Sequence, residues 1–272
     1  MHPWNPSNTV DKLRINNGVP ATQAKPGLMS APRDMKEAIS WERSMLRRIL
    51  AFFILASIKT VGRLLFSFEV EHQGDQPVAW SEVRLIAWIN HTSLYDVFLI
   101  SVIPYGTLWR ASKDCLTPIA EKTYRRPVVG FIFRNLTMSK TAVSQKRDDT
   151  WSQFLDSISA ESMVALFPEG RMKRTSGLDR HGRPLTVRGG IADVLSRMNN
   201  GQMLIQYSGG MHHIHAPGQR FPRLFKTVRV RLETVGVQEY KHSLERADHE
   251  AFKTEVIRDL TARRDRTLVE LS

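Results

Sequence analysis

The sequence predicts an α/β domain with a mixed, largely parallel sheet flanked by helices and preceded by an amphipathic helix at a membrane interface. Short apolar strands alternate with helical stretches through the middle of the chain, an order typical of α/β proteins. Segment 163–167 is a compact apolar run, as expected of a buried strand. The 272 residues are enough to bury one full core of this kind.

The first 40 residues differ in character from the rest of the chain. Five prolines lie there among Asn, Asp and Lys, and no apolar run interrupts them. We therefore expect residues 1–40 to form an irregular N-terminal arm without a signal peptide.

A basic-edged apolar helix is predicted over residues 41–69. The uninterrupted apolar run at 49–57 is too short for a bilayer span, which needs about twenty residues. A helix of this composition suits the membrane interface, and the alternative is a buried packing helix. One face recurs at helical spacing and is apolar except for Ser57, and the cations take part of the opposite side: Leu46, Leu50, Phe53, Ile54, Ser57, Ile58, Val61, Leu64 and Leu65 against Arg47, Arg48, Lys59 and Arg63.

Residues 70–240 form the predicted domain. It begins with a turn-rich break at 71–76, and its strands and helices follow. At 228–232 apolar residues alternate with arginines, as in a half-exposed strand. A charged C-terminal helix is expected over 241–272. The remaining predicted strands lie at 83–89, 108–112, within 128–138, at 163–167 and at 203–207, and the helices at 93–102, 144–159 and 188–198.

The charge balance points to anionic partners. Lys and Arg number 39 against 27 Asp and Glu, a net charge of +12, which suits phosphates, nucleic acid or an acidic membrane surface. No zinc-finger spacing, RNA-binding motif or helix-turn-helix is recognisable, so we expect no nucleic-acid partner. The single cysteine, Cys115, excludes an internal disulfide framework and fits a reducing compartment.

A polar motif, Asn90-His91-Thr92-Ser93-Leu94-Tyr95-Asp96, follows the first strand of the domain. In a continuous helix His91 and Asp96 would be five steps of about 100° apart and unable to meet. They meet if His91 precedes the helix and the first turn folds its ring toward Asp96. One ring nitrogen would then be held by a carboxylate while the other faces outward as a base, at a helix N-terminus that favours negative charge. Capping and packing are the alternative roles for this pair.

A second motif, Phe167-Pro168-Glu169-Gly170, follows the buried strand. Its proline ends the strand and its glycine opens a loop. Arg171, Lys173 and Arg174 come directly behind. A carboxylate followed by three cations suits an acceptor that carries both hydroxyl and phosphate groups. A turn with a solvated charge run is the alternative.

Together the two motifs resemble the glycerolipid acyltransferase superfamily, which includes the lysophosphatidic acid (1-acylglycerol-3-phosphate) acyltransferases. In that family the His-x-x-x-x-Asp motif supplies the catalytic base and its orienting acid, and Phe-Pro-Glu-Gly shapes the acceptor site. The resemblance extends over residues 70–235. It departs after Gly170, where Arg171-Met172 stand in place of Thr-Arg, and these departures fall where the acceptor would bind.

The resemblance implies an O-acyltransferase of phospholipid biosynthesis that moves a fatty acyl group from acyl-CoA or acyl-carrier protein to a lysolipid hydroxyl. It implies no cofactor or metal, and a peripheral or monotopic position among membrane lipids on the cytoplasmic face. Direct transfer is expected, because no Gly-x-Ser-x-Gly elbow is present. The implied catalytic residues are His91 and Asp96, and the implied substrate-binding residues are Glu169, Gly170, Arg171 and Arg134.

Three other functions remain open from the residues. His212, His213 and His215 cluster near one strand end, but without a Cys ligand, a His-Glu-x-x-His pattern or an acidic companion a metal site is disfavoured, and the pocket rim or surface is the expected place for them. A non-catalytic membrane adaptor would need only the helix and the basic surface. An acyltransferase for a non-glycerol acceptor, such as a lyso-aminolipid, is the third.

Overall fold

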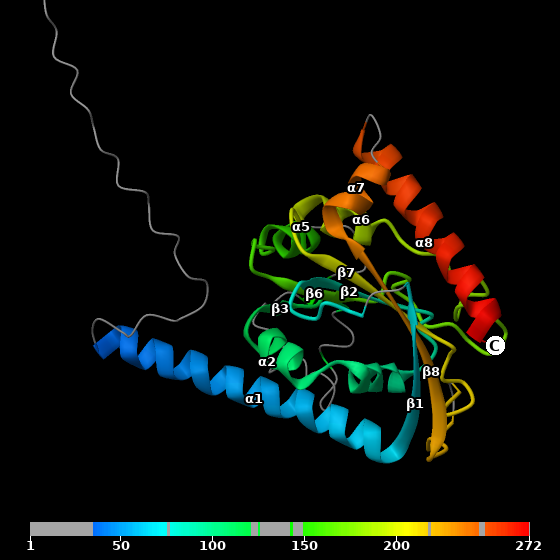
Figure 1. The fold of residues 1–272 in the computed structure, drawn as a ribbon, viewed down its shortest axis with the longest axis horizontal. Coiled ribbons are helices and arrows are strands. Elements are labelled where there is room, and N and C mark those ends of the chain that lie inside the picture. The colour runs from blue at the N-terminus through cyan, green and yellow to red at the C-terminus, as the bar shows by residue number, and fades with distance from the viewer. Residues whose placement is uncertain are drawn as a thin grey trace, which may run out of the picture. The chain divides into compact units, whose positions relative to one another are not determined.

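A six-stranded mixed sheet organises the chain (Figure 1). The computed structural model describes residues 35–74, 77–120, 125, 142–143, 149–216, 219–244 and 248–271. The strand order is β1-β8-β7-β2-β6-β3, with four parallel pairings and one antiparallel pairing, between β7 and β8. The predicted mixed, largely parallel α/β sheet is confirmed. The strands are Phe66–Gln73 (β1), Val83–Ile89 (β2), Cys115–Leu116 (β3), Met163–Leu166 (β6), Gln202–Ser208 (β7) and Lys226–Gly236 (β8), and Ile119–Ala120 (β4) pairs separately with Ala142–Val143 (β5).

Helices cover both faces of this sheet. Alternate residues of the central strands enter opposite cores: Leu85 and Ala87 of β2 pack in one cluster, and Ile86 packs in the other. The first cluster is completed by α5 (Asp149–Asp156), α6 (Gly190–Arg197), α7 (Val237–Ser243) and α8 (His249–Leu271). The second is completed by α1 (Met35–Leu65), the 3-10 helix η1 (Leu94–Val102) and α2 (Tyr105–Asp114).

Three adjacent parallel strands, β6, β2 and β7, end at the same edge of the sheet. The chain leaves β2 into the 90–96 motif, β6 into the 167–170 motif, and β7 into the segment with the three histidines. In open α/β sheets the crevice outside the carboxyl ends of parallel strands is where ligands bind. The topology therefore brings both sequence motifs to one place.

Several predicted elements need correction. The strand predicted at 108–112 is wrong: this segment lies in α2, where Leu108 and Ala111 are buried at helical spacing. The break predicted at 71–76 overlaps β1, whose alternation of Phe66, Phe68 and Val70 with polar residues is a period-two pattern. The helix predicted for 41–69 ends at Leu65, and it begins inside the predicted arm at Met35. The strand predicted within 128–138 lies outside the described residues.

Much of the apolar surface of α1 faces solvent. Residues 42–272 form one compact unit, and within it Ala51 and Leu55 of α1 are buried. The opposite side of the helix carries an exposed apolar stripe, which includes Phe53, 62% exposed. In the part of the chain that the structure describes, no helix is both long and apolar enough to cross a membrane. The stripe consists of Leu46, Ile49, Leu50, Phe53, Val61 and Leu64.

Candidate active site

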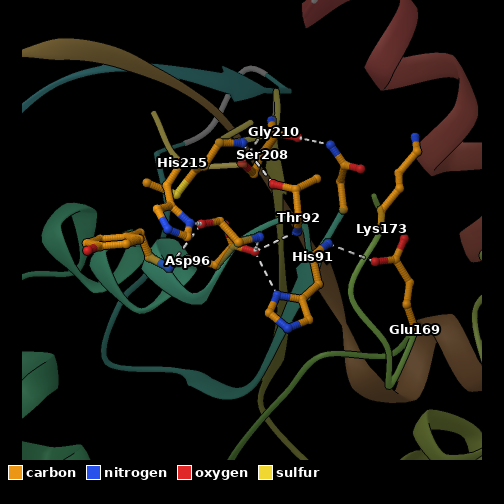
Figure 2. Close-up of polar contacts among 12 residues, drawn as sticks. His91, Thr92, Asp96, Glu169, Lys173, Ser208, Gly210 and His215 are labelled. Carbon is orange, nitrogen blue, oxygen red and sulfur yellow. Dashed lines mark hydrogen bonds and ion pairs between the residues drawn. The ribbon is translucent and has the colours of Figure 1, made fainter. Parts of the chain in front are cut away.

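His91 and Asp96 form a close pair just after β2. The His91 Nδ1 and Asp96 Oδ2 atoms are 2.6 Å apart, with Asp96 buried and the His91 side chain 20% exposed (Figure 2). His91 precedes η1 and Asp96 lies in its first turn, which is the arrangement that the spacing predicted. The ring of Phe167 packs on the imidazole with centroids 4.4 Å apart. Since Asp96 takes Nδ1–H, the other ring nitrogen, Nε2, is left as the proton acceptor.

Asp96 is fixed by backbone donors as well as by His91. Its Oδ2 accepts the Thr92 N–H at 2.7 Å and the Ser93 N–H at 3.1 Å, as part of a capping box at the start of η1. Asn90 takes a positive φ of 71°, which Asn tolerates, and donates through Nδ2 to the Ser208 carbonyl at 2.8 Å. The imidazole partner is thus rigid, but the Thr92 and Ser93 N–H groups are occupied. They donate to the Asp96 carboxylate, which is the negative charge at this helix start.

Glu169 anchors the backbone of His91. The His91 N–H donates to Glu169 Oε2 at 2.8 Å, and the Lys173 N–H donates to the His91 carbonyl at 2.7 Å. Gly170 has a φ of +61°, which turns the chain sharply after the carboxylate. A Cβ there would also lie only 3.3 Å from Cδ of Arg188. The 167–173 loop therefore holds the peptide of His91 from both sides.

Arg264 is a site residue that the sequence analysis missed. From α8 it extends to Glu169, with Nη1 3.3 Å from Oε1, and donates to the Leu185 carbonyl at 2.8 Å. Burial raises the pKa of Glu169, while the His91 N–H and the Arg264 charge oppose that rise. The contact joins residues 95 positions apart, so no local motif indicates it.

The segment after β7 packs against the 90–96 motif. The Met211 N–H donates to Thr92 Oγ1 at 2.8 Å, and Gly210 takes a φ of +93° close to Asn90 and Thr92 (Figure 2). The three histidines contact three different carbonyls, so they do not converge, and His215 is buried beside Tyr95, not at the expected rim or surface. Among the described residues no group of metal-binding side chains is found. The carbonyls are those of Lys173 for His212, Thr227 for His213 and Gln219 for His215.

Two arginines lie beside the Glu169 loop. Arg171 pairs with the buried Asp179 and keeps a third of its side chain exposed. The Arg183 N–H, with the His181 N–H and Arg171, lowers the pKa of Asp179 to about 2. Partial burial lowers the pKa of Arg188, and the nearby Arg171 charge lowers it further. Arg188 was not among the site residues predicted from the sequence. Predicted Arg134 lies outside the described residues.

Fold and site together define the class of the protein. A family model described as Acyltransferase matches residues 69–207, more than half of the chain, and the chain belongs to this family. Both motifs lie within the match, so the resemblance to the acyltransferase superfamily and the prediction of an acyltransferase are confirmed.

Among solved structures the chain is similar to the 1-acyl-sn-glycerophosphate (LPA) acyltransferase PlsC from Thermotoga maritima. The two are 16% identical, the comparison covers 83% of this chain and 87% of that one, and the TM-score is 0.48. No curated protein matches the chain.

Proposed function

We propose that this acyltransferase transfers a fatty acyl group from acyl-CoA or acyl-carrier protein to the hydroxyl of a lysolipid, namely 1-acylglycerol-3-phosphate or a related lysolipid. The observation that carries the proposal is the 2.6 Å His91–Asp96 pair, which leaves Nε2 as a base at the edge where three strands end. A non-catalytic membrane adaptor would have no use for that pair or for the buried Glu169 behind it.

The chemistry follows from the orientation of the imidazole. Nε2 accepts the proton of the acceptor hydroxyl as its oxygen attacks the thioester carbonyl, and Asp96 stabilises the imidazolium that forms. The tetrahedral intermediate collapses by breaking the carbon–sulfur bond, and the imidazolium returns the proton to the leaving thiolate. The products are the acylated lipid and a free thiol. Neither step uses a cofactor or an acyl-enzyme.

The direct test offers the purified protein labelled acyl-CoA and acyl-carrier protein with a panel of lysolipids, read by mass spectrometry. We expect the acyl label on a lysolipid hydroxyl and release of free thiol in equal amount. Hydrolysis of the thioester without any acylated lipid would contradict the proposal. Transfer to a lyso-aminolipid alone would keep the mechanism and replace the glycerol acceptor.

Arg171 and Arg188 are our candidates for reading an anionic headgroup. Their two charges face one nearby acid, Asp179, and Gly170 leaves room for the Arg188 side chain next to the loop that holds His91. Guanidinium groups bind phosphate through paired N–H donors. We therefore propose that the acceptor phosphate binds beside the 167–173 loop, next to Arg171 and Arg188.

Arg171→Ala and Arg188→Ala should each raise the KM for 1-acylglycerol-3-phosphate by about tenfold or more with little change in kcat, since a charge-assisted hydrogen bond contributes roughly 1.5–3 kcal/mol. Steady-state kinetics in detergent give both constants. Arg180→Ala, which removes an exposed cation of the same segment, is the matched control and should leave them unchanged. Equal effects on an anionic and a neutral lysolipid would show that the two arginines do not read acceptor charge.

We also propose that α1 lies in the interface of a membrane, on the cytoplasmic face, as a peripheral or monotopic attachment. The exposed stripe supports this, because a water-facing helix surface seldom holds six large apolar side chains in register. The net charge of +12 suits the anionic cytoplasmic leaflet.

Leu50→Ser/Phe53→Ser should weaken binding to anionic vesicles by about tenfold or more, because burying a large apolar side chain contributes roughly 1.5–3 kcal/mol. Cosedimentation with phosphatidylglycerol-containing vesicles measures it, and added salt should weaken the wild type as well. Val269→Ser, at an exposed apolar position of α8 outside the stripe, is the control. A double variant that sediments like the wild type would make α1 a packing helix.

A further inference from the structure

A second exposed apolar patch lies far from α1 in sequence, in the loop 219–225 that precedes β8. Phe221 is 73% exposed, Phe225 is 77% exposed and Leu224 is exposed beside them. Large apolar side chains that are exposed together in one short loop mark interaction sites. Arg220, Arg223 and Lys226, all exposed, alternate with them in the sequence.

The backbone holds Phe225 outward at a cost. Its φ is +57°, a left-handed conformation in which a bulky side chain is an outlier, and such strain collects at functional sites. The Phe225 N–H donates to the Leu65 carbonyl, the last residue of α1, at 2.7 Å. The loop therefore adjoins the end of the apolar stripe at Leu64.

The base of the same loop is joined to the active site. The Arg223 N–H donates to the Ile214 carbonyl at 2.8 Å, and His215 Nε2 donates to the Gln219 carbonyl at 2.9 Å. The ring of His215 packs against Tyr95, within the motif that carries His91 and Asp96. These contacts connect the loop to the segment that packs against the His91–Asp96 motif.

We infer that loop 219–225 is a second membrane contact, which inserts Phe221, Leu224 and Phe225 into an anionic bilayer while its arginines pair with lipid phosphates. This rests on the proposed attachment through α1 and extends it. Apolar side chains flanked by cations are the composition that an acidic membrane surface binds. Two contacts that adjoin at Leu65 would fix the orientation of the enzyme on the bilayer, with its acceptor site beside the lipid.

The test places an environment-sensitive NBD label on the full chain at Phe221→Cys, Phe53→Cys or Val269→Cys. Burial raises the pKa of the single native thiol, Cys115, to about 11, so it reacts slowly at neutral pH. Vesicles of phosphatidylglycerol and phosphatidylcholine should shift the emission at 221 and 53 to shorter wavelength and leave 269 unchanged. Pure phosphatidylcholine should give a smaller shift.

Distinct results separate this inference from the attachment through α1. A shift at 53 with none at 221 would overturn the loop contact and keep α1. No shift at either position would overturn both. Independently, Phe221→Ser/Phe225→Asn should lower vesicle affinity about tenfold or more, since Asn accepts a positive φ and the fold is preserved. Its activity on a monomeric short-chain lysolipid should match the wild type, and unchanged vesicle affinity would also overturn the inference.

Discussion

His91→Ala should lower kcat by at least about a hundredfold while leaving the fold intact, because general-base assistance contributes about that much. The imidazole stacks on Phe167 and is partly exposed, and the anchoring of its backbone by Glu169 and Lys173 does not depend on the side chain. Acyl transfer and circular dichroism measured on the same sample check both expectations. A folded His91→Ala protein with near-normal turnover would remove the mechanism.

A double-mutant comparison sharpens this result. Asp96→Asn keeps an oxygen that can accept the Thr92 and Ser93 N–H groups but loses the charge that faces the imidazole. We expect a severe loss in Asp96→Asn, and a double variant with His91→Ala no slower than His91→Ala alone, since residues that act as one unit are not additive. Losses that multiply would show that Asp96 acts independently of His91.

Arg264→Met should cost about 3 kcal/mol of unfolding free energy, because it leaves the buried Glu169 carboxylate without its cation. The pKa of Glu169 is already raised by burial and should rise further in the variant. When a buried carboxyl has a pKa that is higher in the folded than in the unfolded state, the unfolding free energy of the protein falls as the pH rises through the folded-state pKa. The deficit of the variant relative to the wild type should therefore shrink in acid. Urea unfolding across pH measures it.

Two further variants test whether the charge of Glu169 is the cause. Glu169→Gln/Arg264→Met removes the buried charge with its partner, and should recover much of the stability lost by Arg264→Met. Arg258→Met removes an exposed arginine of the same helix that pairs with Glu255, and should cost less than about 1 kcal/mol. A pH-independent deficit in Arg264→Met would indicate lost packing only.

The sequence predicted the local parts of the site better than its long-range parts. The His91–Asp96 contact followed from a five-residue spacing and the end of one strand, both visible in a short segment. The edge shared by β2 and β6 followed from two buried strands, each ending in a polar motif. Arg264 was not predictable in this way, because only the packing of α8 against the sheet brings it to Glu169.

The errors have a similar origin. Segment 108–112 is short and mixes apolar with polar residues, and periodicity alone does not separate a strand from a helix over five residues. The predicted helix end and break overlap β1 because an edge strand has one polar face, and because its pairing with β8 joins residues 160 positions apart. The exposure of the α1 stripe was likewise not predictable from helical spacing. Spacing shows which residues share a face of the helix, but not whether that face is buried or exposed.

The junction of α1 with the catalytic domain determines whether α1 can be deleted to obtain an enzyme that is active without detergent. Lys59 donates to the carbonyls of Ser101 and Ile103 at 2.7 and 2.8 Å, and Arg63 donates to Ser101 at 3.1 Å, so both cap the C-terminal end of η1. β1 starts at Phe66 with no residue between it and the helix. Deleting α1 would remove the cap from η1, the short helix whose first turn positions His91. The truncated protein would therefore gain solubility but lose turnover.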